Sequence, residues 1–572
     1  MGDAFNYGGI RTQPEIISSD PFSLFEGWAS EPDPMDLFSD SSDQDPFPTY
    51  YHDDGAVSHQ LLPQAITELD GILIQRQVLL DPSNTNNNNP ITHHNPNPDH
   101  SSAALFDLLR SGAPNSHRKR SSMNSRSNNY NPSNNNIIIQ SAPAEDSSGK
   151  LSTEELLRIA GARFIQSSSK PGGDSNNNNA VSSNPFDLSF SGLSDEELKN
   201  VELAEFLLTA AEKVGDQQYE RASTLLTECE LQSSPDGDPV QRLVHYFCAA
   251  LREKIERDTG KPQSRGPAKM EEIMMPPREC FLEFYDKVPF PQVSEFAAMQ
   301  AVVDSVATSR RIHIVDFNIK NGEQWTIFMQ ALLSREVPVD CLRISAVAIM
   351  TREVMEETGK RLVNFAAAMS LPFSFHLVML DDFADLKEDM LKLDTDETVA
   401  VLSEYLLTTL IAPAEKLDSV MRTITSLNPC VMVVTEVESN HNSPVFVNRF
   451  IESLFYSSAY FDCLETCMGR DSPHRKFVEL TFFGEGARII VAAEGEERAI
   501  RNVKMDVWRA YFRRFGMEEA DLSLSCLYQA ELVAKKFACW RYCTIGVDGK
   551  SLIVGWKGTP IHSVTAWKFN YE

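Results

Sequence analysis

Residues 311–325 read RIHIVDFNIKNGEQW, and this stretch decides the fold. It opens with a short apolar, β-branched run, which is followed by a turn and a helical pattern. Four more such runs follow along the chain with helical patterns between them, at residues 342–347, 373–379, 399–402 and 430–437. Strands that are apolar along their whole length and alternate with helices are typical of a parallel sheet covered on both faces. The sequence therefore predicts a Rossmann-like α/β domain.

The order of the elements changes toward the C-terminus. A helical pattern spans residues 502–515, and strand-like runs follow at residues 540–545, 552–556 and 564–569. Val547-Asp548-Gly549-Lys550 supplies a tight hairpin turn between the first two of these runs. We therefore expect the sheet to end in antiparallel strands.

Three helices are expected between residues 192 and 260. Ser194 and Glu197 form a capping-box signature at the start of the first helix, Gly215 ends it, and Pro239 opens the third. Apolar residues at three- and four-residue spacing mark one face of each helix. Fewer than three unbroken heptads are present, so we favour an antiparallel helical layer that packs on the core over a coiled coil.

Residues 1–150 are expected to form a disordered arm. Asparagine runs offer no apolar face that could be buried, and all of them lie before residue 180. The formal net charge is -29, and residues 1–60 hold twelve carboxylates and one arginine. After the arm we expect an amphipathic helix with a linker at residues 151–191, and then one domain at residues 192–572. Within this domain, residues 192–260 are the predicted helical cap segment and residues 261–572 the α/β core.

Three features of the first 191 residues bear on function. Aromatic and leucine residues stand among carboxylates, as in activation-type segments that enter a partner's groove, at Phe22, Phe25, Trp28, Leu37 and Phe38. An acidic tail without such a role has the same composition and stays an open alternative. A short basic cluster is a candidate nuclear import signal, at His117, Arg118, Lys119 and Arg120. The helix expected at residues 151–166, with Ser152 and Glu155 as its capping box, either docks on the domain or binds a partner.

Composition also argues against several classes of protein. Ten cysteines without a dense framework, and the lack of an apolar N-terminal stretch flanked by positive charge, predict a reduced, intracellular compartment. No run of about 18 apolar residues occurs, so we expect no membrane span. The negative net charge repels phosphate backbones, so we expect protein partners before DNA.

Motifs that follow one another over residues 192–572 resemble those of the plant GRAS family. The opening helices are similar to its first leucine-rich region, and residues 362–375 to its second. The VHIID signature and the residues after it are matched by His313, Ile314, Val315, Asp316, Gly322, Gln324 and Trp325. The PFYRE segment is matched by Pro444, Phe446, Arg449, Glu452, Tyr456, Phe461 and Asp462. The RVER and SAW segments are matched by Arg498, Arg501, Trp508, Gly516, Trp556 and Trp567.

The chain departs from this pattern in three places. Ile500 stands where an acid is usual, Thr565 opens the SAW triplet, and the arm lacks the Asp-Glu-Leu-Leu-Ala motif of the DELLA branch. The gibberellin response of that branch is therefore not carried over. The resemblance implies a plant protein of a non-DELLA, scarecrow-like type, located in the nucleus, with a helical cap on a Rossmann-like core. It also implies gene regulation through association with other transcription factors or GRAS proteins, as homo- or heterodimers.

The same resemblance raises an enzyme hypothesis, because the family's core is similar to adenosylmethionine-dependent methyltransferases. Such folds bind the cofactor with a Gly-rich turn after the first strand, and usually with an acid that ends the second. Here the turn holds only Gly322, and residues 342–350 contain no carboxylate. Asp316 ends the first strand, but an acid there can equally cap the next helix or hold an internal polar network. We therefore predict no catalytic residue and no cofactor.

Two cysteine pairs and one cluster of cationic residues are candidate metal and DNA sites, and packing is the alternative explanation for them. Cys463 with Cys467, and Cys539 with Cys543, have a spacing that zinc sites use, but we favour packing and predict no metal. Cationic residues cluster around the penultimate helix, and the candidate DNA contacts among them are Arg509, Arg513 and Arg514. We favour a solvated helix whose cations pair with Glu496 and Glu497. Four tryptophans are expected to anchor the core, at positions 325, 508, 556 and 567.

The sequence thus predicts a nuclear transcription regulator that acts through protein–protein association. It would serve as a coactivator or corepressor of DNA-binding transcription factors in plant development or stress signalling. Direct, sequence-specific DNA binding is the alternative, and an adenosylmethionine-binding enzyme is a remote one.

Overall fold

The computed structural model describes residues 138–139, 150–168, 192–262, 266, 273, 276–349 and 352–569. The acidic segments of residues 1–60 and the basic cluster of residues 117–120 lie outside these residues, so the hypotheses about them stay predictions.

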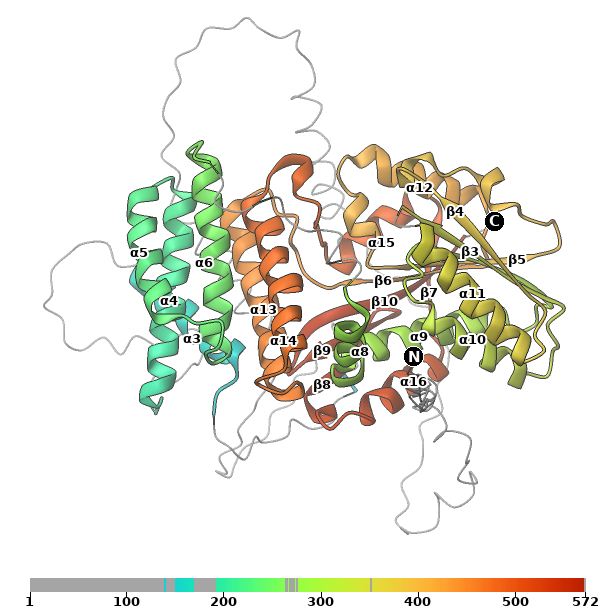
Figure 1. The fold of residues 1–572 in the computed structure, drawn as a ribbon, viewed down its shortest axis with the longest axis horizontal. Helices are drawn as coiled ribbons and strands as arrows, with labels where there is room; N and C mark the ends of the chain where they lie inside the picture. Colours follow the sequence, from blue (N-terminus) through green and yellow to red (C-terminus); the bar gives the residue numbers. More distant parts are fainter. Residues whose placement is uncertain are drawn as a thin grey trace, which may run out of the picture. The chain divides into compact units, whose positions relative to one another are not determined.

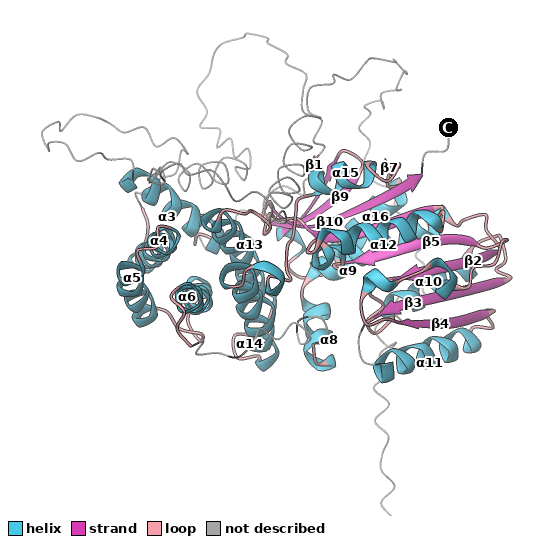
Figure 2. Ribbon diagram, turned by 90° about the horizontal axis from the view of Figure 1, so that it is seen from above, coloured by secondary structure: helices cyan, strands magenta, loops and turns pink. Residues whose placement is uncertain are grey.

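The five predicted parallel strands are all present (Figures 1 and 2). They are β2 (Arg311–Asp316), β3 (Cys341–Ala348), β4 (Phe373–Met379), β5 (Thr398–Glu404) and β6 (Val431–Val437). Their order in the sheet is β4-β3-β2-β5-β6, and each neighbouring pair is parallel. The chain therefore builds outward from β2 first in one direction and then in the other, which is the Rossmann-like arrangement that the sequence predicts.

The antiparallel end of the sheet is also confirmed. The strand β10 (Thr559–Phe569) runs antiparallel to β6, and beyond it lie β9 (Ser551–Trp556) and β8 (Cys543–Asp548). Gly549 has a φ of 61° in the turn between β8 and β9, a conformation that glycine adopts without steric cost. The short strand β1 (Ile138–Ile139) pairs with the free edge of β8.

Three details near the C-terminus differ from the prediction. Residues Trp540–Tyr542 form a turn of 3₁₀-helix, so the strand begins only at Cys543. A strand β7 (Met517–Ala520) and a helix α16 (Leu524–Lys535) were not predicted. The sequence of β7 is MEEA, without apolar alternation, and it forms a strand because β10 supplies hydrogen bonds to it. The helix predicted at residues 502–515 is the shorter α15 (Met505–Arg513).

Helices cover both faces of the sheet (Figure 2). On one face lie α9 (Pro289–Ser305) and α10 (Glu323–Ser334), with α16 packed against α9. On the other face lie α12 (Ala414–Ser426) and α15. The helix α11 (Arg352–Ala368) packs beside β4 at the edge of the sheet.

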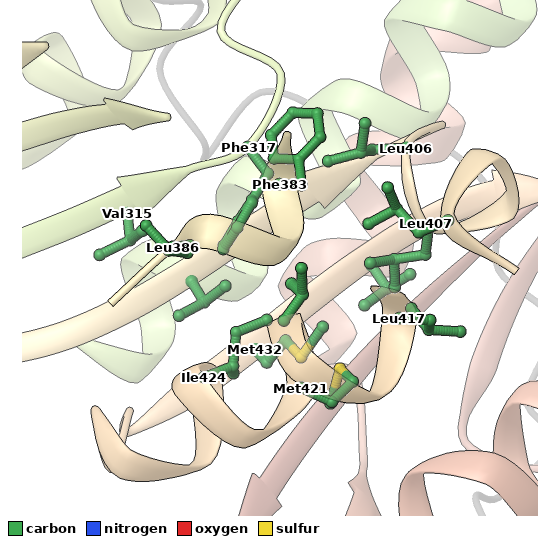
Figure 3. Packing of buried hydrophobic residues seen from close by; sticks show 14 of the residues in the cluster. Val315, Phe317, Phe383, Leu386, Leu406, Leu407, Leu417, Met421, Ile424 and Met432 are labelled. Atoms are coloured by element: carbon green, nitrogen blue, oxygen red, sulfur yellow. The ribbon is translucent and has the colours of Figure 1, made fainter. Parts of the chain in front are cut away.

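The core under α12 and α15 is continuous and apolar (Figure 3). Strand residues such as Val315 and Met432 meet helix residues such as Met421 and Ile424, and all four are essentially inaccessible. Burying one such side chain stabilises the fold by about 2 kcal/mol. All four tryptophans named from the sequence are buried, as predicted.

A second, helical part of the fold joins segments that are far apart in the sequence (Figure 1). It contains α4 (Asp195–Gly215), α5 (Tyr219–Gln232) and α6 (Pro239–Asp258), close to their predicted positions. The helix α13 (Phe446–Cys467) packs against α6, and so do the π-helical turns Glu479–Glu485 and Arg488–Ala492 that follow α14 (Pro473–Val478). The predicted domain boundaries stay predictions, but the cap draws on residues well beyond 260.

The amphipathic helix α3 (Thr153–Ser168) docks on this helical part. It packs against α4 and α13, and the predicted capping box is formed by Ser152 and Glu155, at 2.8 Å. Of the two alternatives left open by the sequence, the described residues therefore favour docking over a free partner-binding helix.

Asp462 on α13 fastens the helical part to the sheet. One carboxylate oxygen accepts the indole N–H of Trp556 on β9 at 2.7 Å and lies 2.8 Å from the ammonium of Lys557. The other oxygen accepts the backbone N–H of Thr153 at the start of α3, at 3.2 Å. One side chain thus holds three segments together.

We expect Asp462→Ala to lower the free energy of unfolding by about 3 kcal/mol, because it leaves the buried indole N–H and a backbone N–H without acceptors. Urea unfolding of the full chain measures the change. The control is Glu230→Ala, which breaks an exposed ion pair with Arg252 and should have little effect. Equal losses from the two variants would contradict the role given to Asp462.

Candidate functional site: the carboxyl ends of the parallel strands

Ligands of open α/β sheets bind outside the carboxyl ends of the strands, where the strand order reverses. In this chain the reversal lies between β2 and β5. The loops that follow β2, β5 and β6 are therefore the place to look for a functional site.

The loop after β2 is held by the carboxylate of Asp316. One oxygen accepts the backbone N–H of Asn318 at 2.8 Å, and the other accepts the indole N–H of Trp325 at 2.7 Å. Burial raises the pKa of Asp316 to about 7, and these two hydrogen bonds oppose the rise. Of the roles left open for Asp316, the internal polar network is the one that the structure shows.

The turn at Gly322 is closed by α11. Gly322 has a φ of 72°, and a Cβ atom placed there would lie 3.0 Å from Thr358 and 3.2 Å from Leu362. Thr358 also donates to the carbonyl of Lys320, at 3.2 Å. The close approach that glycine permits is thus used by a helix of the protein. Residues 341–349, which include β3, carry no carboxylate that could hold a ribose.

The other residues of the VHIID match serve packing. Ile314 and Val315 are fully buried. His313 is buried between Glu397, 2.9 Å from Nδ1, and Ser345, 2.7 Å from Nε2. Removal from water lowers the pKa of His313. The side chain of Gln324 donates to the carbonyl of Ile319 at 3.4 Å.

The arginines of the PFYRE and RVER matches converge on one loop. Arg449 donates to the carbonyls of Ser443 and Pro444, at 3.1 and 3.3 Å, and pairs with Glu494 at 2.6 Å. Arg498 also reaches the carbonyl of Ser443, at 3.4 Å. Desolvation, with repulsion from neighbouring arginines, lowers the pKa of Arg498 to about 9.

The remaining residues of these matches hold neighbouring segments in place. Arg501 donates to the side chain of Asn442 at 3.1 Å. Glu452 lies 3.4 Å from Lys504, and the ring of Phe446 faces the ammonium of Lys254. Gly516 has a φ of 72° at the end of α15. A structural role is enough to explain these contacts.

The candidate DNA-contacting arginines are separated by their partners. Arg509 pairs with Glu519 and Asp506, each at 2.9 Å, so its charge is compensated within the protein. Arg513 and Arg514 are exposed, and Arg514 lies over the ring of Tyr511. The pairing predicted with Glu497 is wrong, because Glu497 binds Arg257 on α6. Helix α15 forms its ion pairs with Asp506 and with residues of β7 and β8, which the sequence did not place beside it.

The two cysteine pairs lie together at the junction of α13 and β8. The sulfurs of Cys463 and Cys467 are 3.8 Å apart, and Cys539 and Cys543 are buried beside them. Burial raises the pKa of Cys543, which keeps this thiol protonated, whereas zinc binds the thiolate. Within the described residues no group of three or more potential ligands is arranged to hold a metal.

A buried hydrogen-bonded chain after β6 was missed from the sequence. Thr408 donates to the side chain of Asn502 at 2.8 Å, whose amide N–H donates to Nδ1 of His441 at 2.8 Å. Nε2 of His441 then donates to Ser439 at 2.9 Å. Burial lowers the pKa of His441 to about 3, so the ring is neutral. Only the position of His441 just after a strand could have indicated this chain.

The model of the GRAS domain family matches residues 203–568. DELLA protein RGL1 of Arabidopsis thaliana is 29% identical over 350 residues, which is 61% of this chain and 66% of that protein. DELLA protein 1 of Medicago truncatula is 28% identical over 363 residues, 61% of this chain and 59% of that protein. The chain thus spans less than two thirds of the length of these relatives.

A solved structure supports the same fold. The crystal structure of SCL7 in Oryza sativa has a TM-score of 0.58 and 27% sequence identity, and the match covers 64% of this chain and 99% of that one. In the part of the chain described here, no helix combines the length and the apolar character needed to cross a membrane.

Glu436, at the end of β6, gives a prediction for pH dependence. Burial raises its pKa to about 8, and its Oε1 accepts the backbone N–H of Leu407 at 2.9 Å. The ordinary pKa of a glutamate is about 4.3, so between these values the folded chain holds a proton that the unfolded chain releases. The stability that Glu436 contributes is therefore lost as the pH rises toward about 8.

We expect Glu436→Gln to flatten this dependence by about 1 kcal/mol per pH unit between about pH 6 and pH 8, because the amide keeps the bond from Leu407 but does not titrate. Urea unfolding at a series of pH values measures the slope. Glu228→Gln, at an exposed side chain of α5, should leave the slope unchanged. Parallel curves for wild type and Glu436→Gln would contradict the assignment.

Proposed function

The chain belongs to the GRAS domain family, and from this premise we propose that it is a nuclear transcription regulator that acts by associating with other proteins. The observation that carries the proposal is the family match, which runs from α4 in the helical part to β10 in the sheet. Its partners would be DNA-binding transcription factors and further GRAS proteins, and it would act on them as a coactivator or corepressor.

The contacts at the carboxyl ends of the parallel strands support a non-catalytic role. The turn at Gly322 is packed against α11, and Asp316 is used by Asn318 and Trp325. A methyltransferase needs an open backbone turn at Gly322 and usually an acid for the ribose at the end of the second strand, β3, where residues 341–349 carry none. Because the fold by itself does not transfer an activity, we give the sheet the role of a scaffold for protein contacts.

An apolar groove between α16 and β8 is a suitable contact surface. Leu524 and Tyr528 on α16 are 84% and 59% exposed, and the groove beside them is lined further by Leu527, Trp540 and Ile545. The edge of β8 next to it accepts an antiparallel strand, since β1 (Ile138–Ile139) pairs with Gly546 and Ile545. We assign the groove to an extended, apolar segment of a partner protein that pairs with β8 in place of β1.

Direct DNA binding is less well supported by the charges. Arg509 is neutralised by two carboxylates, which leaves Arg513 and Arg514 as the exposed cations of α15. A phosphate-binding face needs several such cations, and the domain is otherwise acidic. Strong, salt-dependent retention of the full chain on random duplex DNA would favour this alternative.

The first test of the proposal tethers the chain to a promoter. We expect a fusion with a heterologous DNA-binding domain to change reporter transcription in plant cells, in either direction. Leu524→Asp should reduce the effect about tenfold, because it places a charge in the apolar groove. The matched control is Leu231→Asp on α5, where the side chain is 77% exposed and outside the groove. No effect from the tethered wild-type chain would sink the proposal, and equal loss from both variants would sink the assignment of the groove.

The second test addresses the enzyme alternative. Calorimetric titration of the full chain with adenosylmethionine should give no heat beyond dilution, because α11 fills the space at Gly322. Leu362→Ala, which removes one of the packed side chains, should not create binding, since no carboxylate at the end of β3 is available for the ribose. Micromolar affinity of the wild type would overturn the scaffold interpretation.

A further inference from the structure

A cavity lies beside the closed turn, between the sheet and the helical part. Its volume is about 300 Å³, within the range of about 300–1,000 Å³ found for small-molecule sites. The floor comes from the loops after β2, β5 and β6, which contribute Lys320, Tyr405 and His441. The roof comes from α13 and the π-helical turns, which contribute Tyr456, Tyr460 and Phe483.

The walls are mostly aromatic and are fixed by ring contacts. The ring of Tyr460 lies 4.8 Å from that of Phe483, and the ring of Phe284 on α8 (Arg278–Lys287) lies 5.7 Å from that of Phe482. Such edge and tilted contacts hold rings in place. The π-helical turns that carry Phe482 and Phe483 are a feature often found at functional sites. The cavity is thus formed in advance and suits an apolar guest.

A chain of hydrogen bonds leaves one proton over at the cavity. Tyr405 lies 3.1 Å from Nδ1 of His562, Tyr460 lies 3.1 Å from Nε2, and Tyr460 is bonded in turn to Tyr456. Burial lowers the pKa of His562 to about 3, so the ring is neutral and carries one N–H. His562 also bonds to the backbone of Phe290, which takes up only the ring N–H. Three hydroxyl protons and this N–H serve three links, so one hydroxyl proton has no acceptor in the chain.

The proton left over belongs to Tyr456 or to Tyr405, depending on the tautomer of His562. If Nδ1 accepts from Tyr405, Nε2 donates to Tyr460 and Tyr460 donates to Tyr456, so the hydroxyl proton of Tyr456 is left over. If Nδ1 donates to Tyr405, each hydrogen bond is reversed and the hydroxyl proton of Tyr405 is left over. Ser294, 3.3 Å from Nδ1, competes only at the Tyr405 end. Both outer tyrosines line the cavity and are only half-buried, and neither has another acceptor among the described residues.

Lys320 adds a charged donor to the same space. Its ammonium lies 5.0 Å from the ring centre of Tyr405, and no carboxylate of the described residues is within ion-pair distance of it. The nearby carboxyl of Glu295 has its pKa raised to about 8 by burial and by Glu404, so it is largely neutral at pH 7. Lys320, Tyr405 and Tyr456 thus offer hydrogen-bond donors to the cavity, beside the amide and hydroxyl groups that also line it.

We propose that this cavity binds a small, largely apolar molecule that carries one hydrogen-bond acceptor, a carbonyl or a carboxylate. Its acceptor would meet the hydroxyl of Tyr456 or Tyr405 and the ammonium of Lys320, and its apolar body would lie among the rings of the roof. Because floor and roof belong to the sheet and to the helical part respectively, the ligand would stabilise their association. This inference goes beyond the proposed function and does not depend on it.

The test measures the unfolding temperature of the full chain with three matched probes: 2-naphthoic acid, methyl 2-naphthoate and 2-methylnaphthalene. We expect the acid and the ester to raise the unfolding temperature and the hydrocarbon to raise it much less. A larger effect of the acid assigns the acceptor to Lys320, and equal effects of acid and ester assign it to the tyrosines. Either outcome supports the proposal.

Variants locate the binding. Tyr405→Phe combined with Tyr456→Phe removes the spare donor without changing the shape of the cavity, and should weaken binding of the ester about tenfold. Ala487→Phe, which fills the cavity wall, should abolish binding of both probes. Tyr219→Phe, on α5 and outside both the cavity and the groove, is the matched control and should have no effect on probe binding. The unfolding temperature of each variant without probe reports whether it is folded.

Three outcomes would overturn the proposal. They are no shift with any of the three probes, an equal shift with the hydrocarbon, and a shift that persists in folded Ala487→Phe. Because none of these measurements involves transcription, their failure is separate from a failure of the tethered reporter.

Discussion

The structure depends on a buried carboxylate that accepts hydrogen bonds from the protein's own groups. Asp316 ends β2, just before the place where a Rossmann-like sheet usually presents a glycine-rich turn to a ligand. Here it is buried and binds the backbone of Asn318 and the indole of Trp325. This fixes the start of α10 against the strand, and α11 closes over Gly322. The fold is kept, while the position that would hold a nucleoside is used for packing.

A second constraint is the joint between the helical part and the sheet. Asp462 ties α13 to β9 and to α3, and Arg449 ties α13 to the π-helical segment and to the loop after β6. Buried charged groups of this kind are costly unless every partner is in place. The joint therefore fixes the spacing of the two layers, and that spacing creates the aromatic cavity beside the closed turn. A scaffold for protein contacts and a preformed small-molecule cavity are thus consequences of one arrangement.

The exposed residues distinguish between proteins and nucleic acid as partners, a choice that the composition leaves open. The acidic balance of the chain is accompanied by internal pairing of its cations, as with Arg509 and Glu519 or Arg257 and Glu497. Exposed apolar side chains, in contrast, gather on α16 next to the edge of β8, where only the two-residue strand β1 is paired among the described residues. An edge strand with apolar neighbours is a template for an added strand. These two features favour proteins over nucleic acid as partners.

The sequence by itself determined the parallel strands, the capping-box helices and the antiparallel end, because apolar periodicity, capping residues and the Val547–Lys550 turn act locally. It also determined the absence of an acid from residues 342–350. The strand β7, the ion pairs of Arg509 and the chain from Thr408 to His441 depended on the tertiary structure. These contacts join residues from 10 to 94 positions apart, so no local pattern encodes them. The cavity belongs to the same class, since its floor and its roof come from separate segments that only the folded packing brings together.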